Sequence, residues 1–344
     1  MGQLTLEELI LTQHAGAPKL AIKADLKGKT VMVVGANTGI GLQAAIHFAS
    51  MNASKVILAC RSEERGKKAV AEVEKATGLK NAELWLLDLS RFASVVEFAD
   101  RFEKEGGRLD ILVMNAGIAV RKYEDMEGWE STLHINHLST ALCSLLLLPR
   151  LLKTASDFSV QTRLVVVSSE VHYWTAIKED VRSSPSILKK LNEREYYETA
   201  IHDRYQLSKL LNVLFVRALT AHLPSTSPLI ISAVNPGFCD SELRRNVTEW
   251  TPPSIEHEGK KLELVAWTSE EGARQLVWAA LGPVGDVNKA RGAYMSHNDI
   301  MEPSDFVLSK EGKECQDRVW DETIEILSEV TPKVTEIAKQ YVSA

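Results

Sequence analysis

A short apolar run that ends in a glycine-rich turn constrains the fold of this chain more than any other stretch. Residues 31–34 carry no charge, as expected of a parallel strand that is buried on both faces. Gly35, Gly39 and Gly41 follow, and glycine lets a backbone turn sharply and approach an anion closely. The next helix, expected over residues 42–50, directs its free amide groups and positive dipole end at this turn. The stretch therefore predicts a loop that binds an anion, and its strand-turn-helix order favours a dinucleotide.

Strand-like and helix-like segments alternate along the chain. Further apolar runs predict strands at residues 55–60, 83–87, 109–114, 163–169, 228–234 and 292–295. Helices are expected at residues 63–77, 92–104, 126–152 with an interruption near Asn136, and 205–222. This rhythm predicts an α/β fold, a doubly wound parallel sheet of about seven strands in a single domain over residues 1–344. Ligands of such sheets bind at the carboxyl ends of the strands, near the point where the strand order reverses.

Polar and small residues follow four of these predicted strands. They are Asp88 after the third strand, Asn115-Ala116-Gly117 after the fourth, Ser168-Ser169 after the fifth and Asn235-Pro236-Gly237 after the sixth. Each group alone could be an ordinary turn, but four groups at one sheet edge indicate a binding site. Asp88 is placed to accept a hydrogen bond from an adenine amino group.

The residue after the second strand bears on the choice between NAD and NADP. Arg61 stands there, 20 positions beyond Gly41, and no acidic residue occupies the strand end. An acid at this point binds the ribose hydroxyls of NAD, whereas an arginine pairs with the extra phosphate of NADP. The sequence therefore favours NADP, and the alternative is that Arg61 is a solvated side chain that opens a charged helix.

Composition excludes several classes of partner. With 45% hydrophobic and 25% charged residues, the chain of 344 residues is an ordinary globular protein. Its net charge of -6 argues against a nucleic-acid or anionic-membrane partner. Four scattered cysteines without CxxC spacing indicate reduced thiols in a cytoplasmic protein. The apolar residues 141–152 contain Pro149 and are fewer than the ~20 that span a bilayer, so we predict a buried helix and no transmembrane or targeting segment.

Tyr205 and Lys209 form a candidate acid-base pair. They stand four residues apart and so share one face of the last predicted helix. A phenol has a pKa of ~10, and a nearby ammonium stabilises the phenolate and lowers that pKa. Tyr205 then becomes a usable general acid or base. The spacing alone would fit two solvated side chains, so the pair gains its weight from following the strand that ends in Ser169.

The glycine-rich turn, the polar groups after the strands, Asn136 and the Tyr205–Lys209 pair follow one another in a characteristic order. In this order the chain resembles the short-chain dehydrogenase/reductase family over residues 28–300. Residues 163–169 with His172, and residues 205–215, are most similar to the retinol-dehydrogenase and WW-domain oxidoreductase branch, which is also common among fungal biosynthetic reductases. The resemblance implies a Rossmann-type fold and an NADP(H)-dependent enzyme. This enzyme would interconvert a ketone or aldehyde and an alcohol on a lipophilic, retinoid-, steroid-, terpenoid- or polyketide-like molecule. Reduction is the expected direction.

The resemblance also implies roles for individual residues. Tyr205 would pass a proton to the carbonyl oxygen of the substrate, and Lys209 would lower the Tyr205 pKa and hold the nicotinamide ribose. Ser169, rather than Ser168 on the opposite side of the strand, would bind the carbonyl oxygen. Asn136 would interrupt its helix and bind a water that links Lys209 to solvent, or else it is only a kink residue. The implied catalytic residues are Asn136, Ser169, Tyr205 and Lys209, and the implied cofactor-binding residues are Gly35, Asn37, Thr38, Gly39, Ile40, Gly41, Arg61, Asp88, Leu89, Asn115, Ala116, Gly117, Tyr205, Lys209, Pro236, Gly237 and Ser241.

Two long segments, residues 170–204 and 238–267, are predicted to overhang the nicotinamide as substrate loops. Their aromatic residues suit a sizeable apolar substrate, or else the rings only pin the loops down. These residues are Tyr173, Trp174, Tyr196, Tyr197 and Trp250, accompanied by Ile177, Pro252 and Pro253. Met114 replaces the first residue of the usual Asn-Asn-Ala-Gly motif. His172 and His202 lack metal-ligand spacing, so we interpret them as structural and expect no metal.

Several alternatives stay open at this point. A protein that senses a dinucleotide without turnover, or an isomerase or cyclase, would use the same fold. The apolar helices over residues 138–152 and 207–219 would either pair in a homodimer or be covered by the chain's own extensions in a monomer. Residues 1–27 form an N-terminal extension whose small amphipathic helix is expected to pack on the body or on a neighbouring molecule.

Overall fold

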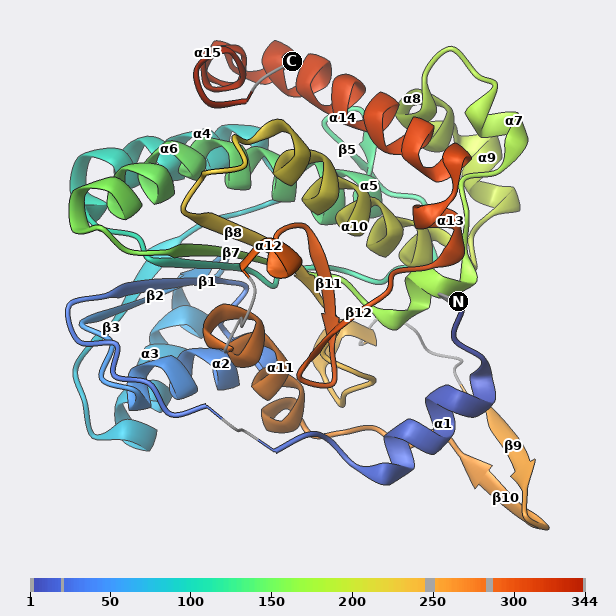
Figure 1. Ribbon diagram of the computed structural model, residues 1–344, viewed down its shortest axis with the longest axis horizontal. Coiled ribbons are helices and arrows are strands. Elements are labelled where there is room, and N and C mark those ends of the chain that lie inside the picture. The colour runs from blue at the N-terminus through green and yellow to red at the C-terminus, as the bar shows by residue number, and fades with distance from the viewer. Residues whose placement is uncertain (1–2, 20–21, 245–250, 283–286, 343–344) are drawn as a thin grey trace.

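An eight-stranded sheet runs through the centre of the molecule (Figure 1). The computed structural model describes residues 3–19, 22–244, 251–282 and 287–342. The strand order is β12-β11-β8-β7-β4-β1-β2-β3, and every pairing is parallel except that of β12 with β11. The strands are β1 (Thr30–Val34), β2 (Lys55–Cys60), β3 (Ala82–Leu86), β4 (Ile111–Met114), β7 (Thr162–Val167), β8 (Leu229–Val234), β11 (Ala293–Ser296) and β12 (Asp299–Met301). The predicted doubly wound α/β fold is confirmed.

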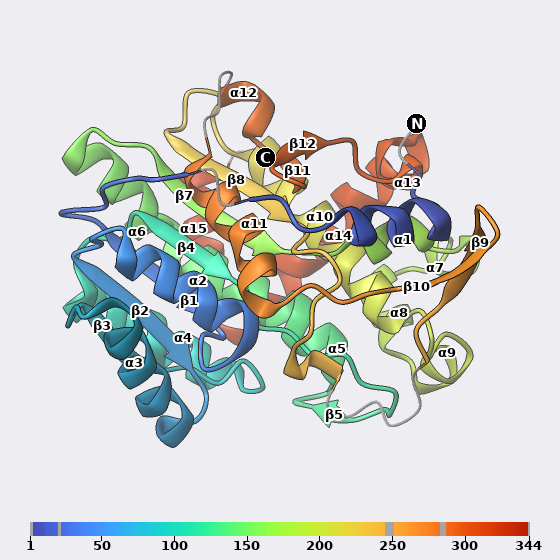
Figure 2. The same cartoon turned by 90° about the horizontal axis from the view of Figure 1, so that it is seen from below.

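Helices cover both faces of this sheet (Figures 1 and 2). One face carries α2 (Gly39–Ser50), α3 (Glu63–Thr77) and α11 (Ser269–Leu281). The other face carries α4 (Phe92–Arg101), α6 (Thr140–Phe158) and α10 (Arg204–His222). Strand β1 serves both layers, since Val31 and Val33 pack toward α2 whereas Met32 and Val34 pack toward α6. This burial on two sides explains why the strand sequences are apolar throughout rather than alternating.

Shorter elements complete the chain. The helices are α1 (Leu6–Ala15), α5 (Ser131–Leu133), α7 (Glu179–Arg182), α8 (Ile187–Asn192), α9 (Arg194–Thr199), α12 (Val287–Ala290), α13 (Asp305–Leu308), α14 (Lys310–Val330) and α15 (Pro332–Tyr341). The hairpins pair β5 (Asp125–Met126) with β6 (Trp129–Glu130) and β9 (Ser254–His257) with β10 (Lys260–Glu263). Two π-helices, η1 (Phe102–Gly106) and η2 (His134–Ser139), and two 3-10 helices, η3 (Glu170–Trp174) and η4 (Glu242–Arg244), are also present among the described residues.

The helix predicted over residues 126–152 is wrong at its start and confirmed at its interruption. Residues 125–130 form the β5-β6 hairpin instead, because Glu127 and Gly128 have φ angles of 52° and 86° that a right-handed helix does not contain. The π-helix η2 surrounds Asn136, where the interruption was expected. Beyond it, α6 continues through Pro149 and ends at Phe158.

The sheet has one strand more than the sequence predicts. His297 and Asn298 have φ angles of 55° and 58° and form the two-residue turn between β11 and β12. Positive φ at both turn residues matches the right-handed twist of a hairpin. The strand escaped prediction because it is only three residues long and largely exposed.

The apolar helices are buried rather than exposed. Among the described residues, the run Ser131–Phe158 is the one long and apolar enough to cross a membrane, but 78% of its most apolar window is buried inside the molecule. The helices α14 and α15 lie over α10 and α6 as a further layer (Figure 1). Trp320 of α14 stacks on Phe215 and on His222, with ring centroids 6.2 and 4.8 Å away. The C-terminal helices α14 and α15 therefore cover parts of α10 and α6.

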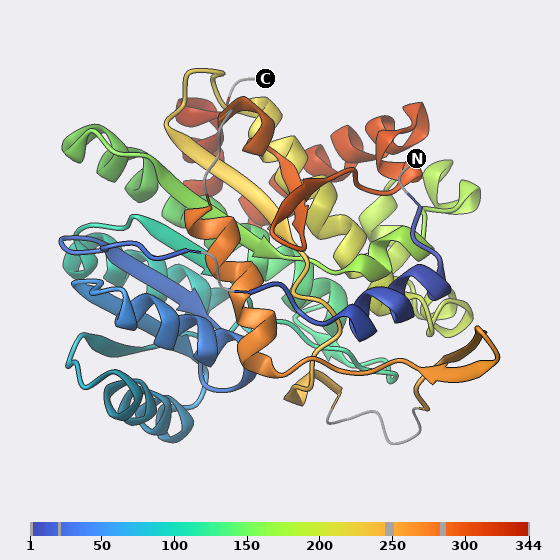
Figure 3. The ribbon, with the colours of Figure 1, turned by 60° about the horizontal axis from the view of Figure 1, so that its bottom comes forward.

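The N-terminal helix α1 packs on the body of the protein, beside the β9-β10 hairpin (Figure 3). Leu9 and Ile10 form a small apolar cluster with Leu264. Gln13, which is 2% exposed, donates from Nε2 to the carbonyls of Phe238 and Val265, both at 2.9 Å. Its Oε1 accepts from the Phe238 amide at 3.2 Å. One side chain thus joins both ends of the second long segment to the N-terminal extension.

We expect Gln13→Leu to lower the free energy of unfolding by about 1–3 kcal/mol, because the partly buried backbone groups of Phe238 and Val265 lose their partners. Urea denaturation measures this loss. Gln3 lies exposed on the same extension, so Gln3→Leu is the matched control and should change stability little. Equal stability of the two variants would show that α1 does not hold the segment in solution.

Candidate active site

A cavity of about 260 Å³ opens at the carboxyl ends of the parallel strands. It spans the gap between β1 and β4, where the strand order reverses. The predicted cofactor-binding residues that line it are Gly35, Asn37, Thr38, Gly39, Ile40, Arg61, Asp88, Leu89, Asn115, Ala116, Gly117, Tyr205, Lys209, Pro236 and Ser241. Gly41 and Gly237 are the predicted cofactor residues that do not line it.

The glycine-rich turn leaves no room for side chains. Gly35 has a φ of 81°, and a Cβ there would stand 2.8 Å from Ala116. A Cβ on Gly41 would stand 2.3 Å from the Gly35 carbonyl oxygen, so Gly41 acts through packing. The Asn115 side chain donates to the same carbonyl at 2.9 Å. Because Thr38 makes no side-chain cap, the amide groups at the start of α2 remain available to an anion, which fits a dinucleotide pyrophosphate.

The part of this cavity beyond the end of β2 is basic. Arg61 follows β2 and lies exposed on the cavity wall, beside Ser62 and Arg65. Arg65 pairs with Glu242 at 3.1 Å across the mouth. Ser62 and Arg65 were not predicted from the sequence, although their position in the first turn after Arg61 was a usable signal. This end can accept a phosphate group.

A second cavity of about 250 Å³ adjoins the first. Apolar side chains form somewhat more than half of its walls, and its polar residues are Arg121, Ser169, Glu170, His202, Tyr205, Gln206 and Ser241. The two cavities share five residues: Ile40, Tyr205, Pro236, Ser241 and Leu243. A molecule in the second cavity would therefore meet a ligand of the first beside Tyr205.

Lys209 lies buried behind Tyr205. Its Nζ stands 5.6 Å from the centroid of the Tyr205 ring and donates to the Val167 carbonyl at 2.8 Å. Burial lowers the pKa of Lys209 to about 8. The Ser168 Oγ donates to the Lys209 carbonyl at 2.8 Å, whereas Ser169 faces the second cavity, as the alternation along a strand predicts.

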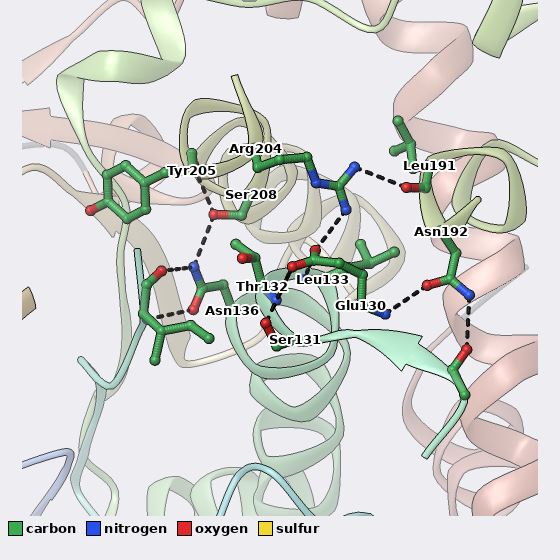
Figure 4. Close-up of polar contacts among 12 residues, drawn as sticks. Glu130, Ser131, Thr132, Leu133, Asn136, Leu191, Asn192, Arg204, Tyr205 and Ser208 are labelled. Carbon is green, nitrogen blue, oxygen red and sulfur yellow. Dashed lines mark hydrogen bonds and ion pairs between the residues drawn. The ribbon is translucent and has the colours of Figure 1, made fainter. Parts of the chain in front are cut away.

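Asn136 lines neither cavity and instead organises the residues around them (Figure 4). Its side chain exchanges two hydrogen bonds with the Ile118 backbone, both at 2.9 Å, and donates to the Ser208 Oγ at 3.0 Å. Its main-chain carbonyl accepts from Asn212 at 2.7 Å, and the Asn212 Oδ1 is 3.5 Å from the Lys209 Nζ. Asn212, which the sequence analysis missed, thus joins Asn136 to Lys209. Its position three residues beyond Lys209, on the same helix face, was the available signal.

Residues 29–173 match the family model for short chain dehydrogenases. The short chain dehydrogenase/reductase dmxR8 of Cryptosporiopsis sp. (strain 8999) is 39% identical to this chain over 311 residues, which make up 90% of this chain and 93% of that protein. The chain belongs to the short-chain dehydrogenase/reductase family. As a member of this family it is an oxidoreductase, a dehydrogenase or reductase, whereas its branch within the family stays a prediction.

Solved structures of short-chain dehydrogenases and reductases share the fold at lower identity. The structure of salutaridine reductase from Papaver somniferum has a TM-score of 0.58 and 21% identity, and the match covers 78% of this chain and 99% of that one. A short chain dehydrogenase from Escherichia coli CFT073 in complex with NADPH has a TM-score of 0.56 and 21% identity, covering 81% and 100% of the two chains.

Among the described Tyr, Trp and Phe side chains of the two long segments, only Phe238 lines the second cavity. Tyr173 donates to the Glu302 carbonyl, and Trp174 donates to the Leu4 carbonyl at 2.6 Å. Tyr197 packs edge-on against Tyr123 at 5.3 Å. These rings anchor the first segment to other parts of this short-chain dehydrogenase/reductase. Anchoring was the alternative to substrate binding that the sequence left open for them. Only the ends of the described parts of the two segments border the cavity, and Trp250 lies outside the described residues.

A buried ion pair holds the start of the helix that carries Tyr205 (Figure 4). Arg204 and Glu130 are 3% and 0% exposed and lie 2.7 Å apart. Arg204 also donates to the Leu191 carbonyl at 2.8 Å, and Glu130 accepts from the second and third amides of α5. Removing one partner of such a pair costs about 3–5 kcal/mol, because the other charge stays buried. The pair therefore fixes the position of Tyr205, the next residue.

The two histidines near the site differ in their surroundings. His172 is buried between the Ser169 carbonyl, at 2.7 Å from Nδ1, and the Ser304 amide, at 3.1 Å from Nε2. Burial lowers its pKa to about 4, so it is a neutral structural residue, as predicted. His202 lies exposed in the wall of the second cavity. Over the described ranges, no three His, Cys, Asp or Glu side chains come together as a metal site.

We expect Gly35→Ala to destabilise the fold more than Gly78→Ala. Both glycines have positive φ angles, 81° and 71°, but a Cβ on Gly78 would meet nothing within 4 Å. The difference in the free energy of unfolding should be about 1–3 kcal/mol, the cost of forcing a methyl group against Ala116. Urea denaturation of both variants gives this difference, and equal losses would contradict the close packing of the turn.

Proposed function

We propose that the protein is an NADP(H)-dependent reductase that interconverts a ketone or aldehyde and an alcohol on a lipophilic small molecule. The observation that carries this proposal is that Tyr205 stands in the wall of both cavities with Lys209 buried behind it. A reducible group in the second cavity would meet Tyr205 and the ligand of the first cavity at one place.

Support for NADP(H) comes from the basic end of the first cavity. Arg61 and Arg65 line it, and a guanidinium binds a phosphate through paired charge-assisted hydrogen bonds. The Escherichia coli neighbour with NADPH has the same fold. Glu242 competes for Arg65 when no phosphate is present, so Arg61 is the better candidate for selectivity.

The residues around the second cavity have separate roles in the proposed reaction. NADPH, when bound, supplies a hydride to the carbonyl carbon. Tyr205 donates a proton to the carbonyl oxygen, and the charge that develops on its own oxygen is stabilised by the Lys209 ammonium. Ser169 holds the same carbonyl oxygen through its hydroxyl. The apolar side chains Val120, Val171, Ile201 and Phe238 exclude water and accept a lipophilic substrate.

Two wider aspects of the proposal rest on the relatives and on the packing. The fungal relative supports a role in secondary metabolite biosynthesis. The cover that α14 and α15 form over α10 and α6 favours a monomer, and we propose a cytoplasmic location. A dinucleotide sensor would need the first cavity but not the Tyr205–Lys209 arrangement. An isomerase or cyclase would need Tyr205 without consuming NADPH.

We expect Tyr205→Phe to lower kcat/KM for ketone reduction by about 100-fold or more, because the proton donor is lost. NADPH binding, measured by thermal shift, should persist. Tyr196 lines neither cavity, so Tyr196→Phe is the matched control and should keep wild-type activity. Unchanged turnover in Tyr205→Phe would show that Tyr205 is not the proton donor. Formation of an isomerised product without oxidation of NADPH would favour the isomerase.

Arg61→Ala should weaken NADPH binding by about 10- to 100-fold and leave NADH binding nearly unchanged, because only NADPH carries the extra phosphate. Fluorescence titration with both cofactors gives the two dissociation constants. Lys67→Ala removes a positive charge from the exposed side of α3, away from the cavity, and controls for net charge. The same loss in both variants would contradict a specific contact at Arg61.

The pH profile of reduction should follow the charge of Lys209. With its pKa lowered to about 8, the amine is protonated below that pH and neutral above it. We expect kcat/KM to fall about tenfold per pH unit above pH 8, because the neutral amine no longer stabilises phenolate. A profile from pH 6 to 10 measures this, and a flat profile through pH 9.5 would contradict the assigned role.

A further inference from the structure

The wall of the second cavity contains a buried carboxyl group that the proposed reduction does not use. Glu170, the first residue of η3, is 5% exposed and follows Ser169 directly. Its Oε2 accepts a hydrogen bond from the Asn235 side chain. Among the described residues, no partner binds its other oxygen, Oε1. Oε1 is not one of the fully enclosed atoms without a partner among the described residues, so water reaches it, and a donor group of a ligand can replace that water.

We propose that Glu170 is a substrate-binding residue whose carboxylate accepts a hydrogen bond from a hydroxyl group of the substrate. The substrate class is therefore a hydroxy ketone or hydroxy aldehyde with an apolar body. This inference rests on the proposed function, because it assumes that the carbonyl group lies at Ser169 and Tyr205. A hydroxyl on the same molecule then meets Glu170 in the same cavity.

The surroundings of Glu170 hold the carboxyl group in place but leave Oε1 to the cavity. Asn235 is fixed in turn, since its Nδ2 also donates to the Ser296 Oγ at 3.1 Å and its Oδ1 accepts from the Gly237 amide at 3.1 Å. This network cannot turn to supply a second donor without breaking its own bonds. The other walls combine apolar side chains with further polar residues, among them Ser169 and Tyr205. A few fixed polar groups among apolar side chains are the usual arrangement for orienting a small molecule.

The charge state of Glu170 and of its neighbours supports the same role. Burial raises the pKa of Glu170 to about 7, so carboxylate and acid are both populated near neutral pH. Tyr173 on η3 and Tyr294 on β11 interact with the Glu170 charge. His172 packs against both rings, and His297 is joined to Asn235 through Ser296. Burial lowers the pKa values of His172 and His297 and raises those of Tyr173 and Tyr294, so all four side chains are neutral above pH 7. Arg121 and His202 stand elsewhere in the same cavity wall.

Matched ketones test the proposal. The probes are 3′-(hydroxymethyl)acetophenone with 3′-(methoxymethyl)acetophenone, and the corresponding 4′ pair, since a methoxy group cannot donate a hydrogen bond and a benzylic alcohol does not ionise between pH 6 and 8. The measured quantity is the ratio of kcat/KM for the hydroxy ketone to that for the methoxy ketone. We expect a ratio of about ten for at least one pair at pH 8, as a hydrogen bond to a charged group gives. If a pair binds without turnover, inhibition constants give the same ratio.

Two comparisons separate binding from a structural role. In Glu170→Gln the ratio should fall to about one, because an amide held by Asn235 turns its own donor toward the cavity. The matched control is Glu195→Gln, an exposed residue of the same segment, which should keep the wild-type ratio. A purely structural role for Glu170 would lower both rates and leave the ratio unchanged, which would overturn the proposal.

The unmodified protein provides a second measurement that needs no variant to fold. The ratio should decrease as the pH falls from 8 to 6, because the acid form accepts a hydrogen bond less well than the carboxylate. Titration of Lys209 or Tyr205 affects both ketones equally and cancels in the ratio. A ratio near one for both pairs, independent of pH, overturns the role of Glu170 and leaves the proposed reductase standing. If NADPH reduces none of the ketones and aldehydes tried, the proposed function itself is overturned.

Discussion

The close approach of the Gly35 turn to the end of β4 is the constraint on which the rest of the site depends. Gly35 lies against Ala116, and Gly41 lies against the Gly35 carbonyl, each so near that a Cβ would clash. This contact brings the start of α2 to the gap between β1 and β4, where the amide groups of the helix face the first cavity.

Helix α10 depends on a second set of buried polar contacts. The Arg204–Glu130 pair fixes its first turn, and the hydrogen bonds of Asn136 and Asn212 fix the turns that follow. These contacts bury charges and amides that would cost several kcal/mol if left alone, so they form together or not at all. They hold the first turns of α10, and with them Tyr205 and Lys209, beside the two cavities.

The sequence predicted features that local chemistry determines and missed those that depend on distant contacts. The buried strands and helix α3 were evident because apolar runs and helical patterns act within a few residues. The β5-β6 hairpin was missed because a Glu-Gly turn inside a helical pattern is a weak signal. Most of the predicted site residues meet at one edge because the topology of a parallel sheet places strand ends together. By contrast, the contacts of Gln13, Glu130 and Tyr173 join segments far apart in the chain, and no local pattern indicates them.

The central claim is that a dinucleotide and a reducible group meet at Tyr205, where the two cavities share a wall. A crystal structure of the protein grown with NADP+ tests this most directly. The expected result places the pyrophosphate at the start of α2, the extra phosphate near Arg61, and the nicotinamide beside Lys209 with one face open to the second cavity. A nicotinamide bound elsewhere, or separated from Tyr205 by another part of the chain, would contradict it.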